Sequence, residues 1–115
     1  LHKSDKELAS LLEIQADLLE NAATLLKEGG VLVYSTCSIE PEENIEQIKK
    51  FLDKHKNFRA EPLTPLLPET LISYWQTQEH WSLTETELAD GYLQLLPSRH
   101  GSSGFFISRL RQDPA

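Results

Sequence analysis

The chain has a single cysteine, Cys37, among its 115 residues, and it has no methionine. One cysteine excludes an internal disulfide and a zinc site built from several cysteines, so no metal site is predicted. Low cysteine usage also favours a reducing, cytoplasmic location. No apolar run approaches the roughly 20 residues that a membrane-spanning helix requires, and we expect no association with a membrane.

Basic residues are few: 11 Lys and Arg face 18 Asp and Glu, which gives a net charge of -7. An acidic surface repels phosphate backbones, so this segment alone is a poor nucleic-acid clamp, and RNA binding would need basic surface supplied elsewhere. The length allows one domain or a piece of one. The sequence opens at Leu1 with no methionine and leads at once into a helix signal, which suggests a piece of a longer protein.

The first half of the sequence predicts a helix followed by a strand. The S-x-x-E pattern of residues 4–7 places a helix start at Ser4, and leucines then recur at helical spacing until Gly29, which suits a left-handed cap. Gln15 falls on the apolar stripe of this helix and is predicted to be a buried amide bonded to a neighbouring loop. Residues 31–35, VLVYS, are almost continuously apolar and predict a central strand covered on both faces.

A second helix is predicted to begin at Pro41, since proline suits the first helical turn. Its apolar stripe runs to His55, which we expect at the helix end, interacting with free carbonyls, and Asn57 is a plausible stop. Residues 58–63 predict a short strand.

The remainder predicts an excursion and a hairpin. Residues 63–90 keep neither helical nor strand periodicity well and are interpreted as an irregular excursion or a short helix. Residues 92–96 and 105–110 are strand-like and predict an antiparallel hairpin with a long polar loop. The order of elements predicts an α/β fold that ends in an antiparallel hairpin.

The chemistry is predicted at the end of the first strand, at Thr36-Cys37-Ser38. Ligands of open α/β sheets bind beyond the carboxyl ends of strands, and the next helix N-terminus favours a nearby thiolate. Glu40, Glu42 and Glu43 oppose a further negative charge there. On these residues alone, a small buried hydrophobe is the more frequent role of a free cysteine.

The string GGVLVYSTCSIEPEEN, residues 29–44, resembles the strand-and-turn signature of the Sun (Fmu) family of bacterial RNA cytosine-5 methyltransferases. The helix around Gln15 and the Gly-Phe-Phe of residues 104–106 resemble that family too. The resemblance implies a Rossmann-like, S-adenosylmethionine-dependent methyltransferase sheet. It further implies that residues 1–115 are a C-terminal fragment of a single catalytic domain.

Carried over position by position, the resemblance makes Cys37 the nucleophile that adds to carbon 6 of the target cytosine. Thr36 and Ser38 would orient the thiol or the base, although they are first of all turn formers. The S-adenosylmethionine motif is expected upstream, so no cofactor-binding residue is predicted here and the fragment alone should be inactive. Ser103 stands where the family often has an aspartate before the Gly-Phe-Phe glycine.

Several alternatives remain open at this point. The resemblance favours 16S ribosomal RNA as the substrate, with transfer RNA as the alternative. A cysteine hydrolase would pair Cys37 with His80 or His100, and a non-catalytic acidic interaction module would use Cys37 only structurally. A parallel sheet cut through its middle exposes an edge, so self-association of the fragment is also expected.

Overall fold

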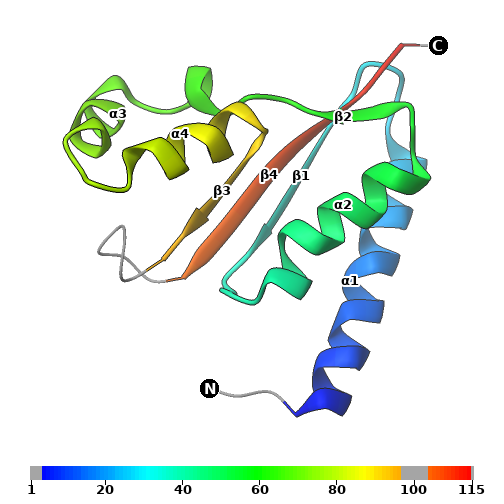
Figure 1. Ribbon diagram of the computed structural model, residues 1–115. Coiled ribbons are helices and arrows are strands. Elements are labelled where there is room, and N and C mark those ends of the chain that lie inside the picture. The colour runs from blue at the N-terminus through cyan, green and yellow to red at the C-terminus, as the bar shows by residue number, and fades with distance from the viewer. Residues whose placement is uncertain (1–3, 97–103, 115) are drawn as a thin grey trace.

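The computed structural model describes residues 4–96 and 104–114, which form helices and the strands of one sheet (Figure 1). The α-helices and strands are, in chain order, α1 Asp5–Leu25, β1 Val31–Thr36, α2 Ile45–Lys54, β2 Phe58–Ala60, α3 Glu69–Gln76, α4 Trp81–Ala89, β3 Tyr92–Leu95 and β4 Phe105–Gln112. Two 3₁₀ turns, η1 Pro41–Glu43 and η2 Thr64–Leu66, precede α2 and α3. The predicted α/β class is confirmed.

The long strand β4 is the centre of the sheet, and all of its pairings are antiparallel. On one side β1 runs its full length beside β4, with Thr36 opposite Phe106. On the other side β3 and β2 follow each other along β4, with Tyr92 opposite Ser108 and Ala60 opposite Leu110. The predicted antiparallel hairpin of β3 and β4 is therefore confirmed; its connection, residues 97–103, lies outside the described residues.

The prediction of a central strand covered on both faces is wrong for β1. Residues 31–35 do form a strand, but among residues 4–96 and 104–114 β1 is an end strand of the sheet. Leu32 and Tyr34 pack against the core on the helical side, whereas Val33 points to the other face and is 55% exposed. The run of residues 31–35 has the pattern of a doubly covered strand because Val31 and Val33, on its outward face, are also apolar; Val33 is nevertheless exposed.

Two layers of helices cover different parts of the sheet (Figure 1). Helices α1 and α2 pack on one face through a core that contains Phe106 and Leu110 of β4. Helices α3 and α4 pack on the other face, where a second core joins Trp75 and Leu88 to Leu93 of β3. Alternate residues of β4 therefore serve both cores, which explains its central position.

Residues 63–90 contain more helix than predicted, because α3 and α4 lie within them. The helical pattern is weak in the sequence for a visible reason: Thr84, a polar residue, is fully buried on α4 beside Leu88. A short helix with a buried hydroxyl lacks the apolar periodicity by which helices are recognised.

The ends of the first two helices follow the predictions in part. The backbone N–H of Glu7 donates to the Ser4 side chain at 3.1 Å, which confirms Ser4 as the N-cap of α1. The helix ends at Leu25, earlier than predicted, and Gly29 takes its left-handed conformation, φ 74°, in the turn before β1. At the end of α2, His55 bonds to Glu20 of α1 at 2.8 Å rather than to free carbonyls, a correction that shows this ring linking the two helices.

Gly29 and Gly91 both have a positive φ but differ in how closely other atoms approach them, so their alanine variants can be compared. A Cβ at Gly29, φ 74°, would meet nothing within 4 Å, whereas one at Gly91, φ 91°, would lie 2.6 Å from the Cβ of Ala60 and 2.9 Å from the Glu61 carbonyl oxygen. Gly29→Ala should therefore lower the free energy of unfolding by about 1 kcal/mol, the cost of the left-handed conformation. Gly91→Ala should lower it by about 3 kcal/mol, since steric overlap adds to that cost. Equal losses in urea titrations of the two variants would contradict the packing around Gly91.

Candidate functional site

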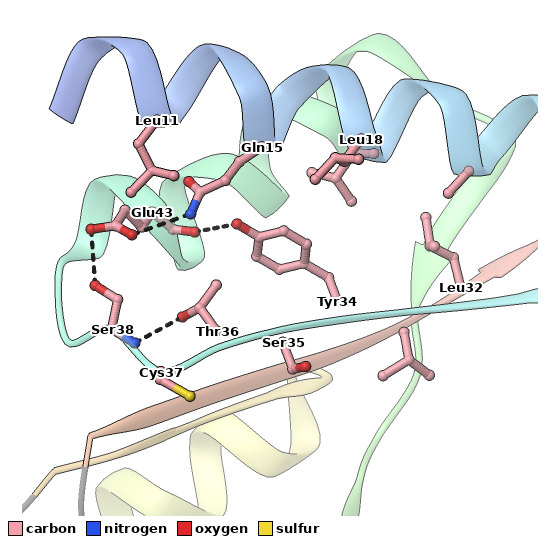
Figure 2. A pocket seen from close by; sticks show the side chains of 13 residues that line it. Leu11, Gln15, Leu18, Leu32, Tyr34, Ser35, Thr36, Cys37, Ser38 and Glu43 are labelled. Carbon is pink, nitrogen blue, oxygen red and sulfur yellow. Dashed lines mark hydrogen bonds between the residues drawn. The ribbon is translucent and has the colours of Figure 1, made fainter. Parts of the chain in front are cut away.

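The turn that follows β1 is anchored through the two residues that flank Cys37. The Thr36 hydroxyl donates to Asn44 Oδ1 at 2.5 Å and accepts from the Ser38 N–H at 3.2 Å. The Ser38 hydroxyl donates to Glu43 Oε2 at 3.0 Å. Both hydroxyls face the start of α2, while the Cys37 side chain points to the opposite side of the strand (Figure 2). The cysteine is exposed, so the interpretation of Cys37 as a buried space-filler does not fit the structure.

Glu43 is a buried acid at the centre of this turn. Only 2% of the residue is exposed, and its carboxylate accepts from Gln15 Nε2 at 3.2 Å as well as from Ser38. Its backbone carbonyl accepts from the Tyr34 hydroxyl at 2.6 Å. A buried carboxylate is tolerated only when hydrogen bonds replace its hydration, and these bonds do so. The predicted role of Gln15, a buried amide bonded to a neighbouring loop, is confirmed.

Burial, and secondarily the negative charge of Glu43, raise the pKa of Tyr34 from 10.0 to about 12. The phenol of an unfolded chain ionises near the lower value, so between about pH 10 and 12 the native state binds more protons than the unfolded state. The free energy of unfolding should therefore fall as pH rises through that window.

This dependence is measured by urea titrations across the window in the natural chain and in Tyr34→Phe. In Tyr34→Phe the free energy of unfolding should decrease less across this pH range, because the variant has no phenol proton to release at this position. Identical pH profiles for the two proteins would contradict the raised pKa.

A groove of about 730 Å³ runs between α1 and β1 and reaches the Cys37 turn (Figure 2). Most of its lining is aliphatic, from residues such as Leu11, Leu18 and Leu32, and Glu43 contributes a carboxylate that is already bonded. Neither a glycine-rich loop nor an acidic ribose ligand is among the lining residues, so the groove does not fit S-adenosylmethionine.

The structure brings together the predicted Thr36-Cys37-Ser38 and reveals two residues that sequence reasoning missed. Asn44 Nδ2 donates to the Ser38 carbonyl at 2.8 Å, and Gln94 Nε2 of β3 donates to the same oxygen at 3.1 Å. Asn44 directly follows Pro41-Glu42-Glu43, whose pattern indicates a helix start and gives no sign of a contact with the Cys37 turn. Gln94 is a polar residue inside a strand-like run, and this pattern marks it as a candidate for a buried hydrogen bond. Nothing in the sequence indicates that its partner is the turn at Cys37.

The predicted partners for a hydrolase are not assembled by the described residues. His80 is the N-cap residue of α4, which packs against β3, and no hydrogen bond to the Cys37 turn is found for its side chain among the contacts of the described residues. His100 lies outside the described residues. No cluster of three His, Cys, Asp or Glu side chains that would hold a metal occurs within residues 4–96 and 104–114. In the same part of the chain, none of the helices has the length and apolar character needed to cross a membrane.

Comparison with known proteins decides the family. The family model of 16S rRNA methyltransferase RsmB/F matches residues 1–111. The chain belongs to the RsmB/F family. This membership confirms the predicted Sun-family resemblance and counts against the cysteine-hydrolase alternative.

Relatives and solved structures agree with membership in the RsmB/F family. A probable ribosomal RNA small subunit methyltransferase B from Synechocystis is 39% identical over 105 residues, 91% of this chain and 21% of that protein. Its counterpart from Bacillus subtilis is 37% identical over 111 residues, 96% of this chain and 22% of that protein. The structure of a methyltransferase homolog from Pyrococcus horikoshii superposes with a TM-score of 0.68 at 30% identity, over 96% of this chain and 34% of that one.

The structure of NSun6 from Pyrococcus horikoshii with SFG superposes with a TM-score of 0.71 at 24% identity, over 99% of this chain and 25% of that one, and it shows the shared fold. The fold is thus that of Rossmann-like methyltransferases, as predicted. The chain spans about a fifth of the length of the curated RsmB/F relatives that it matches.

Proposed function

We propose that these 115 residues are the C-terminal part of the catalytic domain of an S-adenosylmethionine-dependent RNA cytosine-5 methyltransferase, and that Cys37 is its nucleophile. The observation that carries the proposal is the exposure of Cys37 at the carboxyl end of β1, on a turn whose flanking residues are both anchored. The family membership and the short span relative to the curated relatives support the proposal.

The chemistry of cytosine explains why a cysteine is needed. Carbon 5 of the ring is a weak nucleophile because aromaticity holds its electrons. Addition of the Cys37 thiolate to carbon 6 forms a carbon–sulfur bond and makes carbon 5 enamine-like, so that it becomes able to accept a methyl cation equivalent. Loss of the carbon 5 proton then restores the double bond and expels the thiolate. We place the base that accepts this proton in the rest of the protein.

S-Adenosylmethionine would supply the electrophilic methyl group when bound. Because the groove beside Cys37 does not fit it, we place the cofactor site in the rest of the protein. The 115-residue chain alone should accordingly be inactive, and its acidic charge is consistent with basic RNA-binding surface supplied by other parts.

We propose 16S ribosomal RNA as the substrate, because the matching family model is named for 16S rRNA and the curated relatives for the ribosomal RNA small subunit. We further propose that the reaction takes place in the cytoplasm. The full-length protein should transfer methyl groups from labelled S-adenosylmethionine to small-subunit ribosomal RNA, and digestion should release 5-methylcytidine. Labelling of transfer RNA in preference to ribosomal RNA would favour the alternative substrate. Absence of 5-methylcytidine from both would count against the reaction itself and leave the interaction module as the better account.

The isolated chain is also expected to self-associate through β1. One edge of this strand is unpaired within the described residues, and its outward-facing Val33 carries no charge that would discourage pairing with another strand. Light scattering on the isolated chain should show more than one copy, and Val33→Lys should return it to a monomer. A monomer at high concentration would count against this part of the proposal.

A further inference from the structure

The Ser38 carbonyl, one residue after Cys37, is held by two amide side chains that come from different parts of the chain. Asn44 Nδ2 reaches it from the start of α2 at 2.8 Å, and Gln94 Nε2 reaches it from β3 at 3.1 Å. The two amides also bond to each other, since Asn44 Nδ2 donates to Gln94 Oε1 at 2.6 Å. The turn that carries Cys37 is therefore tied to the hairpin on the far side of β4 from β1.

Both amides are themselves fixed by further hydrogen bonds. Gln94 Nε2 also lies 3.2 Å from the Leu95 carbonyl oxygen and 3.1 Å from that of Phe105, and the Gln94 backbone N–H donates to Glu87 at 3.0 Å. Asn44 is 1% exposed, and its Oδ1 accepts from Thr36. Neither side chain has room to reorient without breaking several of these bonds.

The arrangement holds the chain on both sides of Cys37, while the cysteine itself stays exposed. Thr36, before Cys37, is bonded to Asn44, and Ser38, after it, is bonded to both amides. The remaining freedom of the thiol is rotation about its own side-chain bond. A group that must add to one ring carbon needs such control, because a misplacement of about 1 Å costs roughly 100-fold in rate.

We propose that Asn44 and Gln94 are positioning residues that hold the Cys37 thiol in its attacking position. The inference rests on the proposed function of Cys37 and extends it to residues that do not touch the substrate. It assigns a role to Gln94, which lies on a strand separated from the turn by the whole α2–α4 segment.

The test uses Gln94→Met in the full-length protein, which keeps the length of the side chain and removes its hydrogen bonds. We expect kcat for methylation to fall by about 10- to 100-fold with KM unchanged, because the thiol is displaced while RNA binding is not. The rate of covalent bond formation with RNA containing 5-fluorocytosine should fall by the same factor.

The matched control is Gln47→Met, which removes a buried amide of α2 that bonds to the Leu12 carbonyl at 2.8 Å. A loss of stability without a loss of kcat is expected there. Equal effects of the two variants on kcat, an unchanged kcat in Gln94→Met, or a rise in KM would each overturn the positioning role. If Gln94→Met does not fold, the shorter amide of Gln94→Asn, which cannot span the same contacts, is judged by the same criteria.

Failure of this inference is distinguishable from failure of the proposed function. Cys37→Ala reports on the function alone: if that variant still methylates RNA, Cys37 is not the nucleophile and the positioning role falls with it. If Cys37→Ala is inactive while Gln94→Met keeps its kcat and its rate of covalent bond formation, only the positioning role is wrong.

Discussion

Cys37→Ala in the full-length protein is expected to abolish methylation of RNA, with a loss of at least about 1,000-fold in kcat. The magnitude follows from the role: removing a nucleophile removes the covalent route, and such losses in other enzymes reach about a million-fold. The substitution should change the free energy of unfolding by less than about 0.5 kcal/mol, since the cysteine is exposed and has no large buried surface to lose. Initial rates of methyl transfer and urea titrations measure the two effects separately.

The matched control for this variant is Ser73→Ala, which removes one side-chain atom from an exposed position on α3. It should preserve both activity and stability. A Cys37→Ala protein that methylates RNA at a rate comparable to Ser73→Ala would contradict the nucleophile assignment. A Cys37→Ala protein that is inactive because it is unfolded would instead show a large loss in the urea titration, which the exposure of the residue argues against.

Phe106→Ala is expected to have the largest effect on stability, lowering the free energy of unfolding by about 3–5 kcal/mol. Phe106 lies on the central strand β4, is fully buried, and packs its ring against Tyr34 at a centroid distance of 6.3 Å and Tyr92 at 5.9 Å. Its loss would leave a cavity between the sheet and the two helices.

Because a domain of this size has a total stability of only about 5–15 kcal/mol, the milder Phe106→Leu is measured beside the alanine variant. The leucine variant should fall between the natural chain and Phe106→Ala. The control is Leu25→Ala, at a position that is 84% exposed and should cost little. Equal losses in Leu25→Ala and Phe106→Ala would contradict the assignment of the core to the face shared by α1, α2 and β4.

Features with a local sequence signal were predicted well. The Ser4 cap, the first strand and the β3–β4 hairpin depend on neighbours in the sequence, namely a capping pattern and short β-branched or aromatic runs. Gln15 was placed correctly because a polar residue on an apolar stripe must find a partner when it is buried.

Features that depend on distant pairing were predicted poorly. The position of β1 at the end of the sheet is decided by which strands pair with β4, and the apolar run of β1 carries no information about that choice. The contact of His55 with Glu20 and the contacts of Gln94 with the Cys37 turn join residues far apart in the chain. For the site, the sequence indicated the turn that carries Cys37 through family resemblance, and only the structure revealed the amides that hold this turn.

The proposal as a whole depends on a covalent bond between Cys37 and the substrate base, and that bond is directly measurable. Fluorine at carbon 5 of the target cytosine blocks the final proton loss, so the adduct formed after methyl transfer cannot release the thiolate. The full-length protein is incubated with S-adenosylmethionine and ribosomal RNA that carries 5-fluorocytosine, and the cross-linked peptide is identified by mass spectrometry. The account predicts a cross-link at Cys37 that is absent from Cys37→Ala; a cross-link at another residue, or its persistence in Cys37→Ala, would contradict it.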